Sequence, residues 1–62
     1  MIAATNKEKG IELDIRAGSF CIYRTDTFKT IYSGTLESFR NNHDDMRKWA
    51  TAKFDHLCKV KQ

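Results

Sequence analysis

An imidazole and two carboxylates adjoin one another at His43-Asp44-Asp45, the most polar cluster in this sequence of 62 residues. Groups of these types can bind a metal ion or transfer protons when they converge on one point. The apolar spacing around them predicts a helix, on which Asp44 and Asp45 project about 100° and about 200° round the axis from His43. The three side chains cannot meet from one helix. We therefore interpret them as a histidine at the edge of the core above a solvated acidic patch.

Residue types that bind zinc also occur, at Cys21, His43, His56 and Cys58. Structural zinc sites bring their ligands in closely spaced pairs, and here only His56 and Cys58 are close. On a helix these two side chains diverge by about 200°. We therefore expect no metal and no cofactor.

The two cysteines are fewer than the four or more that a secreted mini-protein of this size usually carries. No apolar run is long enough for a signal peptide or a membrane span. These features favour a reduced, cytoplasmic chain with two free thiols and no membrane contact. A disulfide between Cys21 and Cys58 is the less favoured alternative.

Catalytic motifs are absent from the sequence. It contains no nucleophile elbow and no pair of carboxylates with a clear reason to be buried together. Its only glycines, Gly10, Gly18 and Gly34, do not form a phosphate-binding loop. A chain this short also struggles to enclose a pocket. We predict that the protein is not an enzyme.

Aromatic placement is more informative. Trp49 projects about 100° from the centre of the apolar stripe of the predicted helix, where the core does not easily cover it. Exposed tryptophan near cationic side chains is typical of interface anchors, and Arg47, Lys48 and Lys53 would frame this patch. Two interpretations stay open. Either Trp49 folds over the edge of the sheet and is mostly internal, or it contacts a protein partner or a second copy of the chain.

A second surface would suit nucleic acid. Arg16, Tyr23, Arg24 and Lys29 would lie on the predicted sheet, which could enter a groove or stack bases. The net charge of +3 is modest, and no block of like charge occurs. Nucleic-acid binders of this size usually show a denser basic patch. This role is therefore the alternative to protein binding.

A small sheet must position these side chains. Residues 11–16 alternate between apolar and polar, and residues 20–24 and 28–32 are rich in β-branched and aromatic types. Turn-forming residues separate the three segments, which predicts a three-stranded antiparallel meander. Residues 1–9 are polar without a periodic pattern and predict a flexible N-terminal leader. Residues 10–62 then make a single small α+β domain.

A helix follows the sheet, after a hinge at Ser33-Gly34-Thr35 with Thr35 as the N-cap. A continuous helix from 35 to 59 would be roughly 37 Å long, in a domain with a radius of gyration of about 11 Å. It must overhang, break or pack against another molecule. Asn42 could cap a new helix with Asp45 in its first turn. Because the apolar stripe keeps its phase past Asn42, we favour one helix, bent there. The stripe consists of Leu36, Phe39, Met46, Ala50, Phe54 and Leu57.

The sequence therefore predicts an α+β fold, a three-stranded antiparallel meander packed against one long C-terminal amphipathic helix. The predicted function is that of a small non-enzymatic protein-binding module that self-associates, in an accessory or regulatory role. The predicted partner is a protein or a second copy of the chain. Nucleic acid is the second choice.

Overall fold

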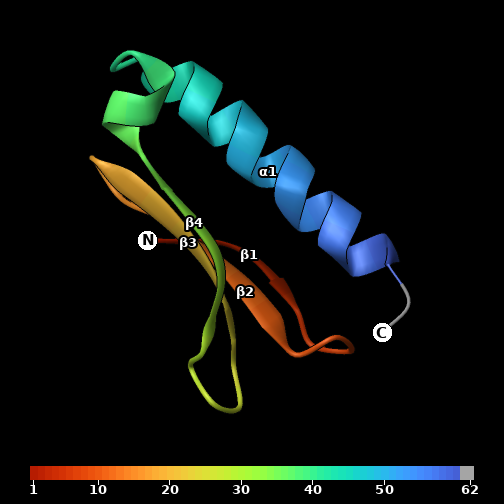
Figure 1. The fold of residues 1–62 in the computed structure, drawn as a ribbon. Coiled ribbons are helices and arrows are strands. Elements are labelled where there is room, and N and C mark those ends of the chain that lie inside the picture. The colour runs from red at the N-terminus through yellow and green to blue at the C-terminus, as the bar shows by residue number, and fades with distance from the viewer. Residues whose placement is uncertain (61–62) are drawn as a thin grey trace.

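The computed structural model describes residues 1–60, which form an antiparallel four-stranded sheet with one helix packed on one face (Figure 1). The predicted α+β class with a C-terminal helix is confirmed, but the sheet has four strands where three were predicted. A short 3-10 helix, η1 (Leu36–Phe39), leads into α1 (His43–Lys59). The strands lie side by side in chain order: β1 (Ile2–Asn6), β2 (Ile11–Ile15), β3 (Ser19–Arg24) and β4 (Thr30–Thr35).

The fourth strand, β1, lies within residues 1–9, which the sequence predicted to be a leader outside the sheet. It pairs antiparallel with β2, with a bulge between Ile2 and Ala4. None of its side chains is fully buried, and only Ala4 packs partly against the core. Because β1 contributes so little to the core, it carries no apolar alternation that would reveal it in the sequence.

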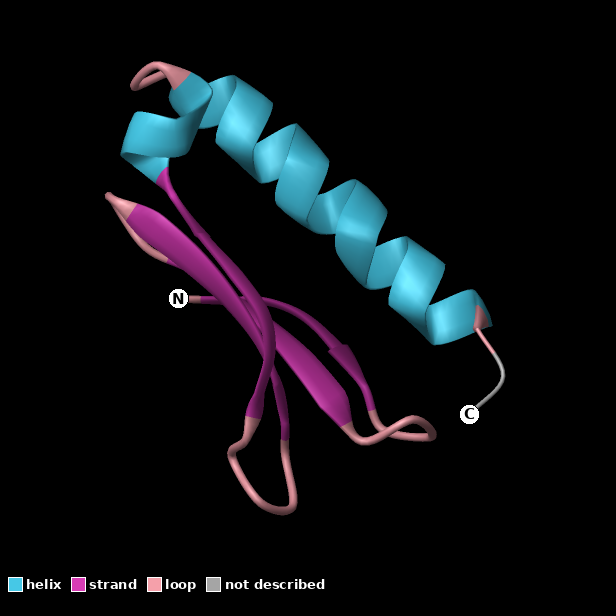
Figure 2. Ribbon diagram, in the orientation of Figure 1, coloured by secondary structure: helices cyan, strands magenta, loops and turns pink. Residues whose placement is uncertain are grey.

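The core lies between α1 and the two central strands, β2 and β3 (Figure 2). The alternation predicted for residues 11–15 is confirmed, since every second side chain of β2 is buried. Within residues 1–60, α1 covers this inner face alone, and the opposite, outer face of the sheet carries no helix (Figure 2). Eight side chains, each at most 5% exposed, make up the core: Ile11, Leu13, Ile15, Phe20, Ile22, Met46, Ala50 and Phe54.

The turn before β4 contains Phe28, which the sequence placed inside a strand. The Phe28 amide donates to the Arg24 carbonyl at 2.8 Å, and Phe28 has a φ of 59°, in the left-handed region. The β1–β2 turn has the same form, because the Gly10 amide donates to the Asn6 carbonyl at 2.9 Å and Gly10 has a φ of 67°. Glycine adopts this backbone freely, whereas other residues do so at a cost of roughly 1–2 kcal/mol.

The prediction of one continuous helix is wrong, because the chain breaks between η1 and α1. Arg40 and Asn41 both lie in the left-handed region, with φ values of 54° and 61°. Their amides donate to the carbonyls of Glu37 and Leu36, at 3.1 and 3.0 Å, which closes η1 in the manner of a helix C-cap. Two consecutive left-handed residues cannot continue a right-handed helix.

Asn42 then starts α1, as the alternative interpretation held. Its side-chain oxygen accepts a hydrogen bond from the Asp45 amide at 3.1 Å, which satisfies one of the free amides at the helix start. The 17 residues of α1 span about 26 Å. This length fits within the longest dimension of the molecule, 32 Å, and its radius of gyration of 11.2 Å.

Candidate functional site

Four aromatic rings meet where β3, β4, η1 and α1 come together, and we call Phe20, Tyr32, Phe39 and Trp49 the aromatic cluster. The Trp49 ring stacks on the Tyr32 ring, with centroids 5.1 Å apart and planes inclined by 21°. The centroid of Trp49 lies 6.1 Å from that of Phe39 and 6.2 Å from that of Phe20. Pairs of this kind contribute about 0.5–1.5 kcal/mol each beyond the area they bury. The cluster therefore holds the indole in a defined position.

Gly34 makes room for the aromatic cluster. It lies inside β4, opposite Phe20, and not in a hinge between sheet and helix as the sequence suggested. A Cβ atom on Gly34 would lie 2.5 Å from Cε1 and 2.9 Å from Cζ of Phe20, well inside the optimal carbon–carbon separation of about 3.5–4.0 Å. Glycine therefore lets the Phe20 ring approach the β4 backbone and stack on Tyr32, 5.9 Å away.

Trp49 is half covered, with 41% of its surface exposed. The ammonium of Lys53 lies 4.9 Å from the centroid of Tyr32, a cation–π contact that contributes about 0.5–1 kcal/mol at an exposed site. Two of the four predicted interface residues, Trp49 and Lys53, thus lie on the same side of α1, and both contact Tyr32 of β4.

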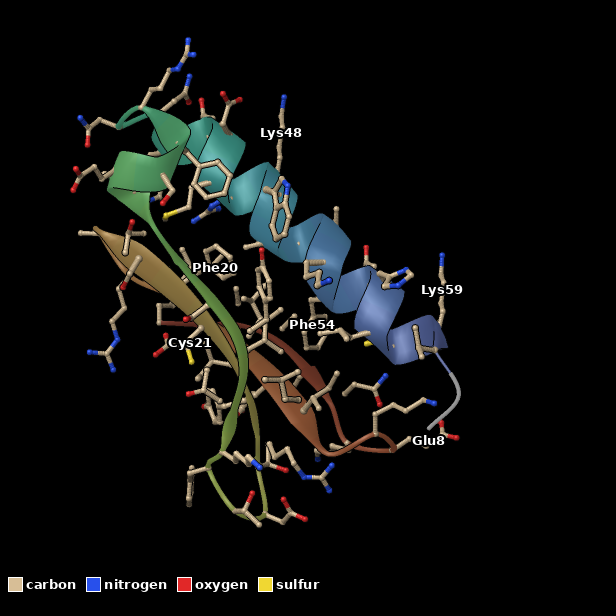
Figure 3. The ribbon with its side chains drawn as sticks, viewed as in Figure 1. Glu8, Phe20, Cys21, Lys48, Phe54 and Lys59 are labelled. Carbon is tan, nitrogen blue, oxygen red and sulfur yellow. The ribbon has the colours of Figure 1, made fainter. Side chains whose placement is uncertain are left out.

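The other two predicted interface residues lie elsewhere. Lys48 points away from the sheet (Figure 3). Arg47 borders a shallow hollow between the start of α1 and the β2–β3 turn. The hollow has a volume of about 460 Å³ and is lined by Met1, Ile15, Arg16, Ala17, His43 and Arg47. The predicted four-residue patch is therefore not one continuous surface.

β4 forms one edge of the sheet, beside the aromatic cluster. The Leu36 amide donates inward, to the Gly18 carbonyl at 2.8 Å. Because backbone direction alternates along the regular part of the ladder, from Tyr32 to Thr35, the polar backbone groups of Thr35 and Ser33 point outward. We call these outward groups the β4 edge. Edge strands are commonly protected by charged residues or proline, but the sequence of β4, Thr-Ile-Tyr-Ser-Gly-Thr, contains neither.

The outer face of the sheet is polar. The Tyr23 hydroxyl donates to a Glu12 carboxylate oxygen at 2.8 Å, and Thr5 donates to the other oxygen at 3.1 Å. The hydrogen bond to Glu12, together with partial burial, raises the pKa of Tyr23 above its usual 10.0. Tyr23 is thus fixed on the outer face, with a carboxylate at the tip of its ring.

The cations predicted to bind nucleic acid mostly have carboxylate partners. Arg16 bonds to Asp14 at 3.1 Å, and Arg24 makes two bonds of 3.1 Å to Asp26. These bonds offset the positive charges that would hold phosphate groups. Lys29 is exposed and has no salt bridge within residues 1–60.

Phe28 is an outer-face residue that the sequence analysis did not select. It is 75% exposed and stacks on Tyr23, with ring centroids 6.2 Å apart. A shallow hollow of about 460 Å³ adjoins it, lined by Asp14, Arg16, Ser19, Cys21, Tyr23, Phe28 and Thr30. No sequence signal pointed to its exposure, because its left-handed backbone is set by the turn.

Tyr32 and Phe39 were also missed as site residues. Both belong to apolar patterns, and nothing in such a pattern separates a core aromatic from one beside an open edge. Trp49, the half-exposed ring that packs against both, is 10 residues or more away in the sequence. It reaches them because the chain turns at Arg40 and Asn41.

Within the described part of the chain, no group of three or more His, Cys, Asp or Glu side chains could hold a metal ion. Cys21 and Cys58 are free thiols, both partly buried. None of the helices in residues 1–60 is long and apolar enough to cross a membrane.

The class of fold is therefore a two-layer α+β arrangement of a four-stranded meander and one helix. No protein-family model matches the chain, and no curated protein or solved structure is significantly similar to it.

Proposed function

We propose that this chain is a non-enzymatic protein-binding module that adds a strand of its partner to β4. The observation that carries this proposal is the β4 edge, which is uncharged and which no other strand within residues 1–60 covers, beside a half-exposed Trp49. An extended segment that joins a sheet edge gains main-chain hydrogen bonds for affinity, while nearby side chains give specificity.

β4 suits this role better than β1, the other edge strand. Both edge strands carry a bulge, that of β1 between Ile2 and Ala4 and that of β4 at Ile31. The regular part of the ladder is longer in β4, from Tyr32 to Thr35, than in β1, from Ala4 to Asn6. A regular strand presents evenly alternating donors and acceptors, which a partner strand can match.

The aromatic cluster supplies the side-chain anchor. Trp49 is stacked on Tyr32 before any partner arrives, so binding costs little side-chain entropy there. Tryptophan and tyrosine are also the residue types that most often dominate binding energy at interfaces. Lys53, above Tyr32, would lie at the rim.

The proposal is tested by blocking the β4 edge without disturbing the sheet. Proline at position 33 removes one outward N–H and no ladder hydrogen bond, whereas Ser33→Ala keeps that N–H. Solution mass by light scattering and Trp49 emission would be recorded over roughly 1 μM to 1 mM protein. We expect the wild type and Ser33→Ala to associate with a blue shift of Trp49, and Ser33→Pro to stay monomeric. Association that survives Ser33→Pro would exclude the β4 edge.

Nucleic-acid binding by the outer face is the second candidate, favoured by the exposed Phe28 ring stacked on Tyr23. Aromatic rings of this kind can stack on bases. The carboxylates of Glu12, Asp14 and Asp26 weigh against it. A titration with fluorescent oligo-dT would show affinity that falls steeply with salt and is reduced by Phe28→Ala. No binding at low salt would exclude this role.

A cytoplasmic location and an accessory or regulatory role are also proposed, and they rest on the sequence alone.

A further inference from the structure

We propose that the segment which joins β4 is acidic and apolar, with one carboxylate side chain that binds Lys53 and one apolar side chain that packs on Trp49. This inference rests on the proposed function and specifies the chemistry of its partner. The surface that recognises the two side chains is the one where Tyr32, Trp49 and Lys53 meet. We call it the β4–α1 seam.

The β4–α1 seam offers hydrogen-bond donors that have no acceptor. Within residues 1–60, the Tyr32 hydroxyl, the Lys53 ammonium and the Trp49 indole N–H make no hydrogen bond to another protein group. No buried side-chain nitrogen or oxygen in this part of the chain lacks a partner, so the hydroxyl and the ammonium both face solvent. Ammonium and indole groups can only donate. A carboxylate would supply the acceptors that the seam lacks.

Lys53 also gives the seam a positive charge without a carboxylate partner. It forms no salt bridge within residues 1–60, and β4 contains no charged residue. Asp45, on the same row of α1, stands two turns before Lys53, which is about 12 Å along the axis. This exceeds the screening distance of about 10 Å at 0.1 M salt. Charge complementarity therefore favours an acidic partner over a basic one.

The backbone of β4 determines where the side chains of the partner lie. Ser33 points its N–H and C=O outward, so it pairs with one residue of an added antiparallel strand. The two neighbours of that residue lie opposite Tyr32 and Gly34, with their side chains on the inner face, towards α1. These side chains stand about 7 Å apart, which is close to the separation of Trp49 and Lys53 along α1, about 6 Å.

The direction of α1 determines which of the two neighbours is acidic. β4 leads into η1, and α1 then runs back across the sheet, so Trp49 is nearer to η1 than Lys53 is (Figure 1). The neighbour opposite Gly34 therefore reaches Trp49, and the neighbour opposite Tyr32 reaches Lys53. Every pair of adjacent strands in this sheet is antiparallel. Added in the same way, the partner reads, in chain order, an apolar residue, any residue, then Asp or Glu.

The test measures how a short peptide, Thr-Thr-Ile-Thr-Glu-Thr-Thr blocked at both ends, binds to the chain. Light scattering first sets a protein concentration at which the chain is monomeric, so that self-association does not compete. Binding is followed by Trp49 emission and by backbone amide shifts in NMR spectra. A second peptide has Gln in place of Glu. We expect the Glu peptide to shift Trp49 emission to the blue and to bind about threefold to fivefold more tightly than the Gln peptide at low salt.

Two lysine variants locate the preference for Glu. Lys53→Gln removes the ammonium and keeps a long polar side chain, so it should bind the two peptides equally. Lys48→Gln is the matched control, because it makes the same change on the side of α1 that points away from the sheet, and it should keep the preference. A preference that persists in Lys53→Gln, or that is absent from the wild type, overturns this inference.

Ser33→Pro separates this inference from the proposed function. If Ser33→Pro abolishes the binding of both peptides but the wild type binds them equally, the β4 edge stands and the acidic chemistry is overturned. The reversed peptide, Thr-Thr-Glu-Thr-Ile-Thr-Thr, should bind more weakly, and equal or tighter binding overturns the stated order. A wild type that binds neither the Glu nor the Gln peptide at about 1 mM overturns the inference, and light scattering of Ser33→Pro then decides the edge alone.

Discussion

The contact between Gly34 and Phe20 shows how one missing side chain sets the geometry of the site. Phe20 is 2% exposed and belongs to the core, yet its ring also stacks on Tyr32 in the aromatic cluster. Phe20 can contact both the core and the aromatic cluster because Gly34, opposite it on β4, has no side chain to occupy that space. The buried ring of Phe20 thus contacts both Tyr32 and Trp49, the two rings that stack on each other.

Gly34→Ala should be destabilising. The new methyl group would lie 2.5 Å from Phe20 Cε1, so the ring must move, at a cost of about 1–3 kcal/mol. Gly18→Ala is the matched control, because a Cβ there meets no atom within 4 Å, and its stability should change by less than about 0.5 kcal/mol. Urea unfolding followed by Trp49 fluorescence measures both. Equal losses in the two variants would contradict the role given to Gly34.

Tyr23 should titrate at unusually high pH. The Glu12 carboxylate accepts its hydroxyl proton and opposes the negative charge of a phenolate, which raises the pKa of Tyr23 above 10.0. Glu12→Gln removes that charge and should lower the pKa of Tyr23 towards its usual value. Ultraviolet absorbance during an alkaline titration measures the change. A pKa of Tyr23 that is the same in the variant and the wild type would show that the hydrogen bond does not persist in solution.

At the scale of elements, the sequence predicted the segments whose side chains form the core, and it missed the features that depend on backbone hydrogen bonds and backbone dihedral angles alone. The strands β2 and β3 and the buried face of α1 follow from side-chain periodicity. β1 escaped because backbone pairing holds it, and the break before α1 escaped because the apolar stripe keeps its phase across it. The helix breaks because Arg40 adopts a positive φ, and arginine is not a residue type from which a positive φ is predicted.

Asn42→Ala should weaken the start of α1. The side chain of Asn42 accepts the Asp45 amide, and loss of such an N-cap costs about 0.5–2 kcal/mol. Asn42→Asp keeps an accepting oxygen and should retain most of the stability. Thermal unfolding by circular dichroism compares the variants. If Asn42→Asp loses as much as Asn42→Ala, the cap is not what holds this helix start.

At the scale of the whole molecule, the candidate site is formed by residues that are far apart in the sequence, and no local sequence pattern predicts that they meet. The direction of Trp49 away from the apolar stripe follows from helical spacing alone, and 41% of its surface is exposed. Its position next to an open edge could not be predicted, since the predicted boundaries of β4 were wrong. Arg47 and Lys48 were grouped with Trp49 by closeness in sequence, and the helix turns them to different sides.

Acid should destabilise the fold through two surface carboxylates. Hydrogen bonds from the N-terminal ammonium and Arg16 lower the pKa of Asp14 below 3.8, and hydrogen bonds from Arg24 do the same for Asp26. Their contribution to stability is therefore complete above pH 3.8 and is lost as the pH falls through the lower values of the folded state. The urea midpoint between roughly pH 5 and 2 measures the loss. Asp26→Asn should lose less on acidification, and an identical loss would contradict this assignment.

The order of the strands also bears on how fast the chain folds. Each strand pairs with the next along the chain, so each pairing closes only a short loop. Mixed domains with such local pairing fold faster than domains dominated by non-local strand pairing, which take about milliseconds to seconds. The 62 residues contain no proline, so the slow isomerisation phase of roughly 10–100 s is absent. Stopped-flow refolding followed by Trp49 should show one fast exponential phase, and any phase lasting seconds would indicate an event outside the monomer, such as association.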